Sequence, residues 1–347
     1  MKKLFISEPV SGGLILSYRC SSTCRHCMYA CSPEWDADWI SRKDAEKTLT
    51  QLSGKIRPSP RGPDRVGVNH GLHLTGGEPF LNFTLLLRTT KMANEWGIPS
   101  TFAETNCYWC AEDGATKNKL EQLKDAGLHG ILISVNPFIL EYVPFERTER
   151  AVRIGAEVFG RNMMIYQEFF YHQFQELGTK GSLPFEGYLR DAGPRSLYHA
   201  ELLGGLFEKY PAKHFFNESC KKELTRNWHV HIDNYGNYIP AYCGGISLGN
   251  AQELDSLRNG IDLSEHAVID ALTTQMSRLY ELGNEFGYKE SKEGYVSKCH
   301  LCVDIRKHLV QQTNEFKELT PSQFYSRLST DPSPSREEGE GVASGNL

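Results

Sequence analysis

The sequence has no run of about eighteen apolar residues, the length that a membrane-spanning helix needs, so we expect no membrane partner. It also has no excess of basic residues. The 38 lysines and arginines against 43 acidic residues give a net charge of -5, which provides no electrostatic footprint for nucleic acid. Before Ser7 the only apolar run is Leu4–Ile6, which is too short for a signal peptide. We therefore expect a cytoplasmic protein.

Cysteine, in contrast, is abundant, with ten in 347 residues. Frameworks of disulfides belong to small secreted domains, whereas a chain of this length buries a large core without them. Metal or cluster ligation is therefore the better interpretation. Four of the ten follow the apolar run Gly13–Tyr18, which predicts a buried strand; they are Cys20, Cys24, Cys27 and Cys31.

Cysteines spaced this closely on one loop can direct their sulfurs at a single centre. Thiolates favour soft metals, and iron–sulfur clusters in particular. If Cys20, Cys24 and Cys27 hold a four-iron cluster, one iron has no protein ligand, and an open coordination position distinguishes a reactive metal site from a structural one. A zinc knuckle or a redox-inert cysteine loop remains the alternative.

Apolar strands and amphipathic helices alternate after this loop. The predicted strands are Gly71–Thr75, Ser100–Thr105, Gly130–Val135 and Asn162–Phe169, and the predicted helices are Ser41–Leu52, Leu81–Trp96, Ala115–Ala126 and Pro144–Phe159. Strict alternation implies parallel strands joined by right-handed crossovers, hence an α/β barrel or an open α/β sheet.

Two short motifs resemble one family. Cys20-Ser-Ser-Thr-Cys24-Arg-His-Cys27 resembles the C-x3-C-x-aromatic-C signature of the radical S-adenosylmethionine (SAM) enzymes, with His26 in the aromatic slot. Gly76-Gly77-Glu78-Pro79, one strand later, resembles the family's G-G-E segment, which holds the amino group of SAM. The resemblance covers roughly residues 13–169 and implies a partial (β/α)6 TIM-type barrel. It also implies a [4Fe-4S] cluster on Cys20, Cys24 and Cys27, SAM, and an external one-electron donor such as flavodoxin or ferredoxin.

Ligands of such barrels lie at the C-terminal ends of the strands, where this sequence has several polar residues. Ser134 and Asn136 resemble family positions that contact the ribose or carboxylate of SAM. Glu104 and Glu168 are predicted as general bases that accept a substrate hydroxyl proton. The predicted cofactor-binding set is His26, Gly76, Gly77, Glu78, Pro79, Asn106, Ser134 and Asn136. For each polar residue, satisfying a strand end is the structural alternative.

A second group of cysteines lies in the last third of the chain. Cys220 and Cys243 bracket a predicted hairpin, and Cys299 and Cys302 form a C-x2-C pair after a predicted helical segment, Ser264–Phe286. This arrangement resembles the twitch domain, a reduced SPASM domain in which four cysteines bind an auxiliary [4Fe-4S] cluster. A single zinc or iron ion in a tetrahedral four-cysteine site stays open as the alternative.

We therefore expect a radical SAM barrel over residues 1–212, a small cysteine-rich, twitch-like extension over 213–328, and a tail of disordered composition over 329–347. Three cysteines lie outside these two sets: Cys31, Cys107 and Cys110. They are predicted as buried thiols, with a further metal site as the alternative.

The resemblance implies an enzyme that cleaves SAM to a 5′-deoxyadenosyl radical and abstracts hydrogen from a small sugar or nucleoside. Four auxiliary cysteines, in place of the seven of full SPASM enzymes, favour a small molecule. The segments C-R-H-C-M-Y-A-C-S-P-E-W and E-T-N-C-Y-W-C are similar to nucleoside-antibiotic decarboxylases, which are lyases that remove a substrate carboxylate. One arginine among Arg147, Arg161 and Arg226 would bind that carboxylate.

Two alternatives remain. One is a radical SAM enzyme that modifies a peptide or protein by crosslinking, oxidation or methylation. The other is a zinc-binding interaction module without catalytic activity. That module predicts basic runs beside the cysteines, where the sequence has only Arg19, Arg25 and Arg42.

Overall fold

The computed structural model describes residues 2–192 and 208–328. Its centre is a seven-stranded sheet of order β6-β5-β4-β3-β2-β7-β8. Every neighbouring pair from β6 to β7 is parallel, and only β7 and β8 are antiparallel. The predicted α/β class with a parallel sheet is confirmed. The strands are β2 (Ser11–Ile15), β3 (Gly71–Thr75), β4 (Phe102–Thr105), β5 (Gly130–Ser134), β6 (Met163–Tyr166), β7 (Val230–Ile232) and β8 (Tyr238–Ile239).

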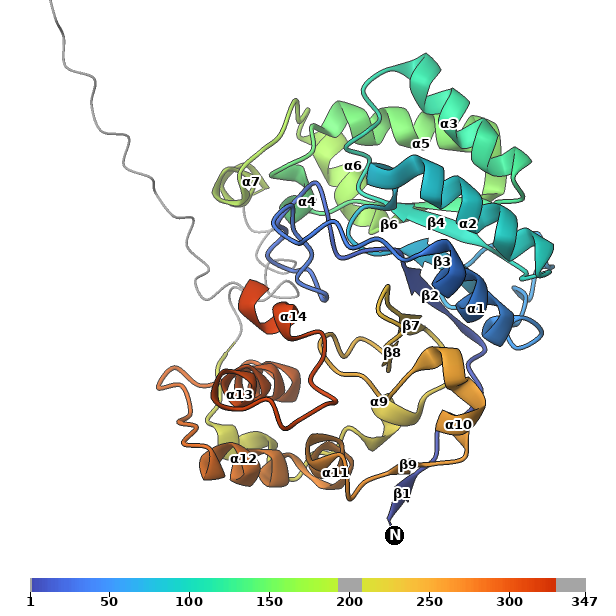
Figure 1. Ribbon diagram of the computed structural model, residues 1–347. Helices are drawn as coiled ribbons and strands as arrows, with labels where there is room; N and C mark the ends of the chain where they lie inside the picture. The colour runs from blue at the N-terminus through green and yellow to red at the C-terminus, as the bar shows by residue number, and fades with distance from the viewer. Residues whose placement is uncertain (1, 193–207, 329–347) are drawn as a thin grey trace, which may run out of the picture.

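Helices follow the parallel strands. The helices over residues 83–95, 113–125 and 145–159 lie on the side of the sheet away from the C-terminal part of the chain (Figure 1). The helix over residues 42–52 contacts that part, where Gln252 donates to Asp44 Oδ1 at 3.1 Å. The helix boundaries follow local sequence signals. Ser41 caps α1 by accepting a hydrogen bond from the Asp44 amide, and Gly127, with φ +100°, follows the end of α3 in the left-handed conformation that favours glycine. These helices are α1 (Arg42–Leu52), α2 (Phe83–Glu95), α3 (Asp113–Asp125), α4 (Pro137–Leu140), α5 (Phe145–Phe159), α6 (Glu168–Glu176) and α7 (Phe185–Ala192).

The fifth predicted strand, Asn162–Phe169, is too long. The strand β6 ends at Tyr166, and the chain enters α6 at Glu168. The aromatic residues that follow have helical spacing, and Phe170, Tyr171 and Phe174 bury the inner face of α6. Burial of that face outweighs the β propensity of the aromatic run.

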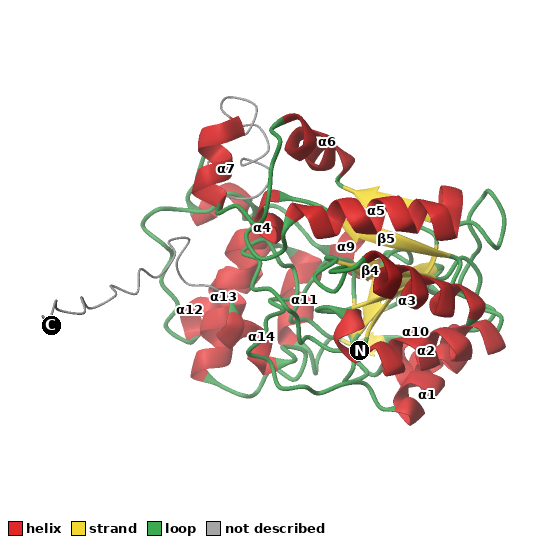
Figure 2. Ribbon diagram, turned by 90° about the horizontal axis from the view of Figure 1, so that it is seen from above, coloured by secondary structure: helices red, strands yellow, loops and turns green. Residues whose placement is uncertain are grey.

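The C-terminal part is mainly helical and packs beside the sheet (Figures 1 and 2). The predicted helical segment Ser264–Phe286 divides into α11 and α12. The elements are α9 (Lys221–Thr225), α10 (Leu254–Arg258), α11 (Ala267–Thr274), α12 (Met276–Glu285), α13 (Lys298–Gln312) and α14 (Ser322–Arg327), with β1 (Lys3–Leu4) pairing β9 (Ile261–Asp262). Four 3-10 turns complete the set: Pro79–Asn82, Gly160–Asn162, Ala212–Phe215 and Ala251–Glu253.

The predicted hairpin forms, but its first strand extends the parallel sheet. The strand β7 pairs with β2, with Gly13 opposite His231, and β2 pairs on its other side with β3, with Gly13 opposite His73. The sheet therefore takes strands from both predicted domains. The division into 1–212 and 213–328 stays a prediction, and the predicted tail, 329–347, lies outside the described residues.

None of the helices within residues 2–192 and 208–328 combines the length and the apolar character needed to span a bilayer.

Candidate active site

The cysteine loop and the Gly76–Pro79 turn are in direct contact. The Gly77 amide donates to the Ser17 carbonyl at 2.8 Å, and the Glu78 amide donates to the Arg19 carbonyl at 3.0 Å. The approach is so close that a Cβ at Gly77 would lie 2.0 Å from the Arg19 carbonyl oxygen. Only glycine fits here, because any side chain would separate the two segments. The two motifs therefore form one site at the C-terminal edge of the sheet.

Glu78 ties this turn to the end of β4. Its carboxylate accepts hydrogen bonds from the Asn106 amide at 2.8 Å, the Thr105 hydroxyl at 3.0 Å and the Phe80 amide at 3.2 Å. The side chain is 1% exposed, and burial raises the pKa of Glu78 to about 7 despite these donors. A cation arriving beside this carboxyl would find a group ready to ionise.

Asn106 continues the link from β4 back to the cysteine loop. Its side-chain amide donates to the Ser21 hydroxyl at 3.0 Å and the Ser22 hydroxyl at 3.3 Å, and lies 3.8 Å from the Cys20 sulfur. The predicted cofactor residue thus contacts the loop that carries the predicted cluster ligands.

The three predicted cluster ligands lie together on one loop, where their thiols interact electrostatically. Burial raises the pKa of the Cys20 thiol to about 12, with the Glu78 carboxylate adding to the effect. Burial also raises the pKa of Cys24, and Cys27 and Cys20 contribute as neighbouring negative charges. Such a group of dehydrated thiols is costly to ionise unless a metal balances the charge.

Cys31 has a specific contact that the sequence did not predict. Its thiol donates a hydrogen bond to Cys27 and, as the main cause, lowers the pKa of Cys27 to about 7, while its amide lies 3.4 Å from the same sulfur. Cys31 is thus placed to favour the thiolate form of a predicted ligand. Cys107 and Cys110, in contrast, are fully buried and hydrogen-bonded to each other at the end of β4.

His26 stands between the cysteine loop and α4. The Asn136 side-chain oxygen caps α4 by accepting from the Phe138 and Ile139 amides, so the Asn136 amino group faces the ring and donates to His26 Nε2 at 3.0 Å. The ring stacks on Phe138, with centroids 5.2 Å apart. Nε2 is therefore the acceptor, and Nδ1 carries the proton. That Nδ1 is buried without a hydrogen-bond partner among the described residues.

The other predicted strand-end residues are placed unequally. Glu104 accepts a hydrogen bond from the Thr75 hydroxyl at 2.7 Å, and burial raises its pKa to about 7. Ser134 ends β5, half-buried, opposite Tyr166 in register. Glu168 begins α6, its side chain is 68% exposed, and its carboxylate lies 3.5 Å from His172. Glu104 is therefore the better placed of the two predicted bases.

The three candidate arginines also differ. Arg161 is exposed at the N-terminal end of β6, the opposite edge from the site. Arg147 donates to the Tyr108 carbonyl, which ties α5 to the loop after β4. Arg226 lies over the rings of Trp228 and Tyr242, at 4.0 and 4.5 Å, and its Nε is buried without a partner in the described parts of the chain. Arg226 thus retains donor capacity for an anion, but it precedes β7, which is parallel to β2, so like Arg161 it lies at the N-terminal end of its strand.

The second group of cysteines also comes together in space. Cys220 precedes α9, Cys243 follows β8, and Cys299 and Cys302 lie in the first turn of α13. Burial raises the pKa of Cys243 to about 12, and Cys302 and Cys299 add to it against the nearby Arg306. The pKa of Cys220 is raised as well, mainly by burial and next by the negative charge of Cys302.

A buried arginine accompanies these thiols. Arg306 is 2% exposed and donates from Nε to the Cys302 sulfur at 3.3 Å, from Nη1 to the Gly244 carbonyl at 3.0 Å and to the Tyr325 hydroxyl at 2.7 Å. Within residues 2–192 and 208–328 no carboxylate pairs with it. The Cys302 sulfur and two oxygens thus accept the hydrogen bonds that this buried guanidinium needs.

The distances between sulfurs distinguish a cluster from a single ion. Among the described residues, no three cysteine sulfurs all lie within 4.8 Å of one another. Zinc at about 2.3 Å from each of four thiolates would hold the sulfurs about 3.8 Å apart. A four-iron cluster has its irons at separate corners and so spaces its thiolates more widely. Neither cysteine group therefore forms a closed single-ion site among the described residues, and the choice between a cluster and one ion stays a prediction.

No family model matches the chain, and no curated protein matches it. Among solved structures, BtrN in complex with AdoMet and 2-DOIA is 14% identical, with a TM-score of 0.42 over 77% of this chain and 88% of that chain. Native anSMEcpe with bound AdoMet and the Cp18Cys peptide is 13% identical, with a TM-score of 0.42 over 87% of this chain and 97% of that chain. Both neighbours are radical SAM enzymes. At this TM-score the likeness carries no weight, and the function depends on the contacts described above.

Proposed function

We propose that this chain is a radical SAM enzyme that acts on a small, carboxylate-bearing substrate. The observation that supports the proposal is the direct contact between the cysteine loop and the Gly76–Pro79 turn, through Gly77 and Glu78. Cys20, Cys24 and Cys27 would hold a [4Fe-4S] cluster with one open iron. When bound, such a cluster supplies the electron that cleaves SAM to methionine and a 5′-deoxyadenosyl radical, with flavodoxin, ferredoxin or dithionite as the source.

The residues around the cysteine loop would bind SAM. Glu78 offers a carboxyl for the amino group, and Asn106 and Asn136 lie on the two sides of the loop. His26 has a buried Nδ1–H without a partner among the described residues, and we propose that an adenine nitrogen accepts it. Ser134 and Pro79 complete the proposed set.

The two outermost strands of the sheet, β6 and β8, approach each other at Tyr166 and Tyr242, which supports a rolled, partial-barrel architecture. Tyr166 ends β6 at one edge, and Tyr242 follows β8 near the other. Burial raises the pKa of Tyr166, and Tyr242 and Glu104 are close enough to add to the shift. The space between the strand ends is therefore enclosed by residues from both edges.

Exposed aromatic rings beside Arg226 favour a nucleoside as the substrate. Tyr166, Trp228 and Tyr242 are 51%, 39% and 45% exposed, and stacking on such rings is a general way to bind a base. Arg226 can donate to a carboxylate. We propose cytosylglucuronic acid, as in the decarboxylase of blasticidin S biosynthesis, with Glu104 as the base for a sugar hydroxyl. Hydrogen abstraction beside the carboxylate-bearing carbon, loss of CO2, and return of one electron and one proton balance that reaction.

The second cysteine group would hold an auxiliary cluster. We propose a [4Fe-4S] cluster on Cys220, Cys243, Cys299 and Cys302, supported by the mutual electrostatic coupling of the four thiols and by the contact of the buried Arg306 with Cys302. A single zinc or iron ion on the same four residues is the alternative.

The substrate prediction is tested with the reduced, reconstituted enzyme. Incubation with SAM and cytosylglucuronic acid is expected to release CO2 and form 5′-deoxyadenosine, detected by mass spectrometry. Arg226→Lys should raise KM at least about tenfold, because lysine cannot replace a planar bidentate donor. Arg161→Lys, on the exposed turn before β6, is the matched control and should leave KM unchanged.

Turnover of a peptide, with no turnover of the nucleoside, would refute the small-molecule assignment and favour the peptide-modifying alternative. Equal KM values for both arginine variants would exclude Arg226 as the carboxylate-binding residue.

A pH dependence of SAM affinity follows from Glu78. Its pKa of about 7 means that it is protonated below this pH in the SAM-free protein. The ammonium group of SAM favours the carboxylate, so binding below pH 7 releases a proton, and Kd should rise by about tenfold per pH unit as the pH falls. Above pH 7 the affinity should level off. Equilibrium binding from about pH 6 to about pH 8.5 measures the slope.

Glu104 provides the control, since burial raises its pKa to about 7 as well. Glu104→Gln should retain the pH dependence of the SAM Kd. Glu78→Gln should bind SAM weakly, with a Kd that does not change with pH. A wild-type Kd that stays constant across this range would contradict the assignment of Glu78 to the amino group.

A further inference from the structure

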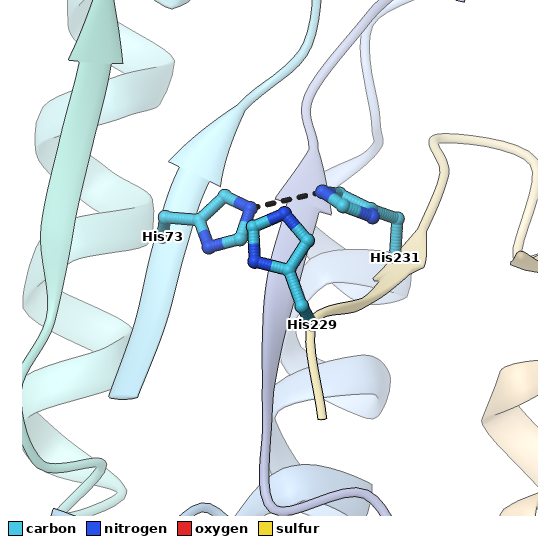
Figure 3. A group of neighbouring side chains, drawn as sticks. All are labelled: His73, His229 and His231. Carbon is cyan, nitrogen blue, oxygen red and sulfur yellow. Dashed lines mark hydrogen bonds between the residues drawn. The ribbon is translucent and has the colours of Figure 1, made fainter. Parts of the chain in front are cut away.

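Three buried histidines meet in the interior of the sheet. His73 comes from β3, and His229 and His231 come from the segment of β7, and the three rings are directed toward one another (Figure 3). His73 Nε2 lies 2.9 Å from His231 Nε2. One ring nitrogen from each residue can be chosen so that all three lie within 4.8 Å of one another. Among the described residues, this is the only such group of three or more His, Cys, Asp or Glu side chains.

Gly13 provides the space that these rings occupy. It lies on β2, between His73 on one side and His231 on the other. A Cβ at Gly13 would lie 2.2 Å from His73 Nε2 and 2.7 Å from His231 Cδ2. The backbone of Gly13 has no positive φ among those observed, so its conformation does not require glycine. Glycine is therefore required at this position because the His73 and His231 rings fill the space that a side chain would occupy.

Backbone carbonyls orient the ring nitrogens. His229 Nδ1 lies 3.2 Å from the Val68 carbonyl oxygen, and because a carbonyl only accepts, Nδ1 carries the proton and Nε2 keeps its lone pair. The Ala241 carbonyl, at 3.3 Å, offers the same kind of partner to His231 Nδ1, which also contacts the Tyr29 hydroxyl at 2.8 Å. Metal-binding histidines typically donate their other ring N–H to a backbone carbonyl or carboxylate, which fixes the tautomer in this way.

The rings are also uncharged, which is the form that binds metal. Burial lowers the pKa of His231 to about 3 and lowers the pKa of His73 and His229. Three neutral imidazoles packed together have lone pairs that a divalent cation can use without displacing protons from charged rings.

We propose that His73, His229 and His231 bind a divalent transition metal ion, for which zinc is the probe. Zinc at about 2.0–2.1 Å from tetrahedral nitrogens holds those nitrogens about 3.4 Å apart. His73 Nε2 and His231 Nε2 would therefore separate by about half an ångström, and the third ring would move inward. Three imidazoles leave one position for an oxygen ligand. Glu104 lies nearby, with Oε1 3.8 Å from His73 Nε2.

This site shares no residue with either cysteine group, although Glu104, the proposed base, lies beside it. Metal binding is therefore measured without turnover, so that its failure is distinguishable from failure of the radical SAM proposal. A cobalt titration separates the two kinds of site. Cobalt bound by nitrogen and oxygen gives visible d–d bands, whereas thiolate ligands add a charge-transfer band in the near ultraviolet. The full chain, stripped of loosely bound metal, is titrated with Co²⁺, and its Zn²⁺ affinity is measured against a chromophoric chelator.

The wild-type chain is expected to bind one ion with d–d bands and no accompanying charge-transfer band. In His73→Ala and His229→Gln this ion should be lost, with zinc affinity at least about 100-fold lower, since even a second-shell change costs 10–100-fold. Gly13→Ala should lose it too, although every ligand is present. Gly114→Ala is the control, because a Cβ at this position on α3 meets nothing within 4 Å.

Equal zinc affinity in the wild-type chain and in His229→Gln would overturn the proposal. The His229→Gln variant retains a polar side chain in the cluster, so the test remains possible if His73→Ala fails to fold. A wild-type chain that binds no ion outside its thiolate sites would also overturn it. In that case the three rings form a hydrogen-bonded network only.

Discussion

Alanine at Cys20, Cys24 and Cys27 together is expected to abolish formation of 5′-deoxyadenosine from SAM. Each single replacement should have the same effect, because a cluster with one ligand missing no longer presents a stable open iron. The fold should survive. The loop is held by backbone hydrogen bonds, among them the Cys20 amide to the Ser32 carbonyl at 3.0 Å, which alanine retains. The measurement is anaerobic incubation with SAM and dithionite, with 5′-deoxyadenosine quantified by chromatography.

Two further cysteines make matched controls. Cys110→Ala removes a buried thiol at the end of β4 that contacts Cys107 and is not a proposed ligand, so cleavage should continue. Cys31→Ala removes the hydrogen bond that lowers the pKa of Cys27, so it should reduce cluster retention without abolishing cleavage. SAM cleavage by the triple variant would refute the assignment of these three ligands.

Local signals in the sequence predicted most of the elements correctly. The Ser41 cap, the glycine after α3 and the buried runs of β3 and β5 depend on neighbours within a few residues, so their physics is visible in the sequence. The predicted C-terminal end of β6 was wrong, because the helix that follows is stabilised by burial of Phe170 and Phe174, which depends on tertiary packing.

Contacts between segments far apart in the chain could not be predicted from the sequence. The placement of β7 beside β2 joins residues more than two hundred positions apart, and nothing in either strand specifies that partner. The three-histidine cluster has the same origin, with His73 and His231 separated by 158 positions. Its only local signal was the H-x-H spacing at 229 and 231, which places both rings on one face of a strand.

The candidate site was predictable where two motifs carried it. The Gly76–Pro79 turn follows one strand after the cysteine loop, and parallel strands bring their C-terminal ends to one edge of the sheet. The aromatic surroundings of Arg226 and the hydrogen bond from Cys31 to Cys27 could not be predicted, because they depend on side-chain directions that only the packed structure fixes.

The auxiliary site is expected to have a large effect on stability. Cys220, Cys243, Cys299 and Cys302 join α9, the loop after β8 and α13, segments that otherwise meet through packing and a few polar contacts, such as the Lys298–Glu223 ion pair and the Arg306–Gly244 hydrogen bond. A metal centre with four protein ligands contributes folding energy directly. Losing one ligand should cost on the order of 5 kcal/mol, a fraction of the 10–16 kcal/mol measured for whole structural sites. The Tm should then fall by about 10–20 °C, at the roughly 2–4 °C per kcal/mol typical of a cooperative domain of about 150–250 residues.

Cys302→Ala should be the most damaging of the four replacements. It removes a ligand and also leaves the Arg306 guanidinium buried without its negative partner, and breaking a buried pair costs about 3–5 kcal/mol. Cys107→Ala is the control, because Cys107 is equally buried but lies at the end of β4 away from Arg306. Thermal unfolding followed by circular dichroism gives the order of the Tm values. Equal Tm values for Cys302→Ala and Cys107→Ala would contradict a metal centre at this site.

Metal analysis then identifies the centre. In the Cys20, Cys24 and Cys27 triple variant the reactive cluster is absent, so the remaining iron belongs to the auxiliary site. About four irons per chain are expected if that site holds a cubane cluster. One zinc per chain with almost no iron would show instead that the four thiolates close around a single ion, and the site would then be structural.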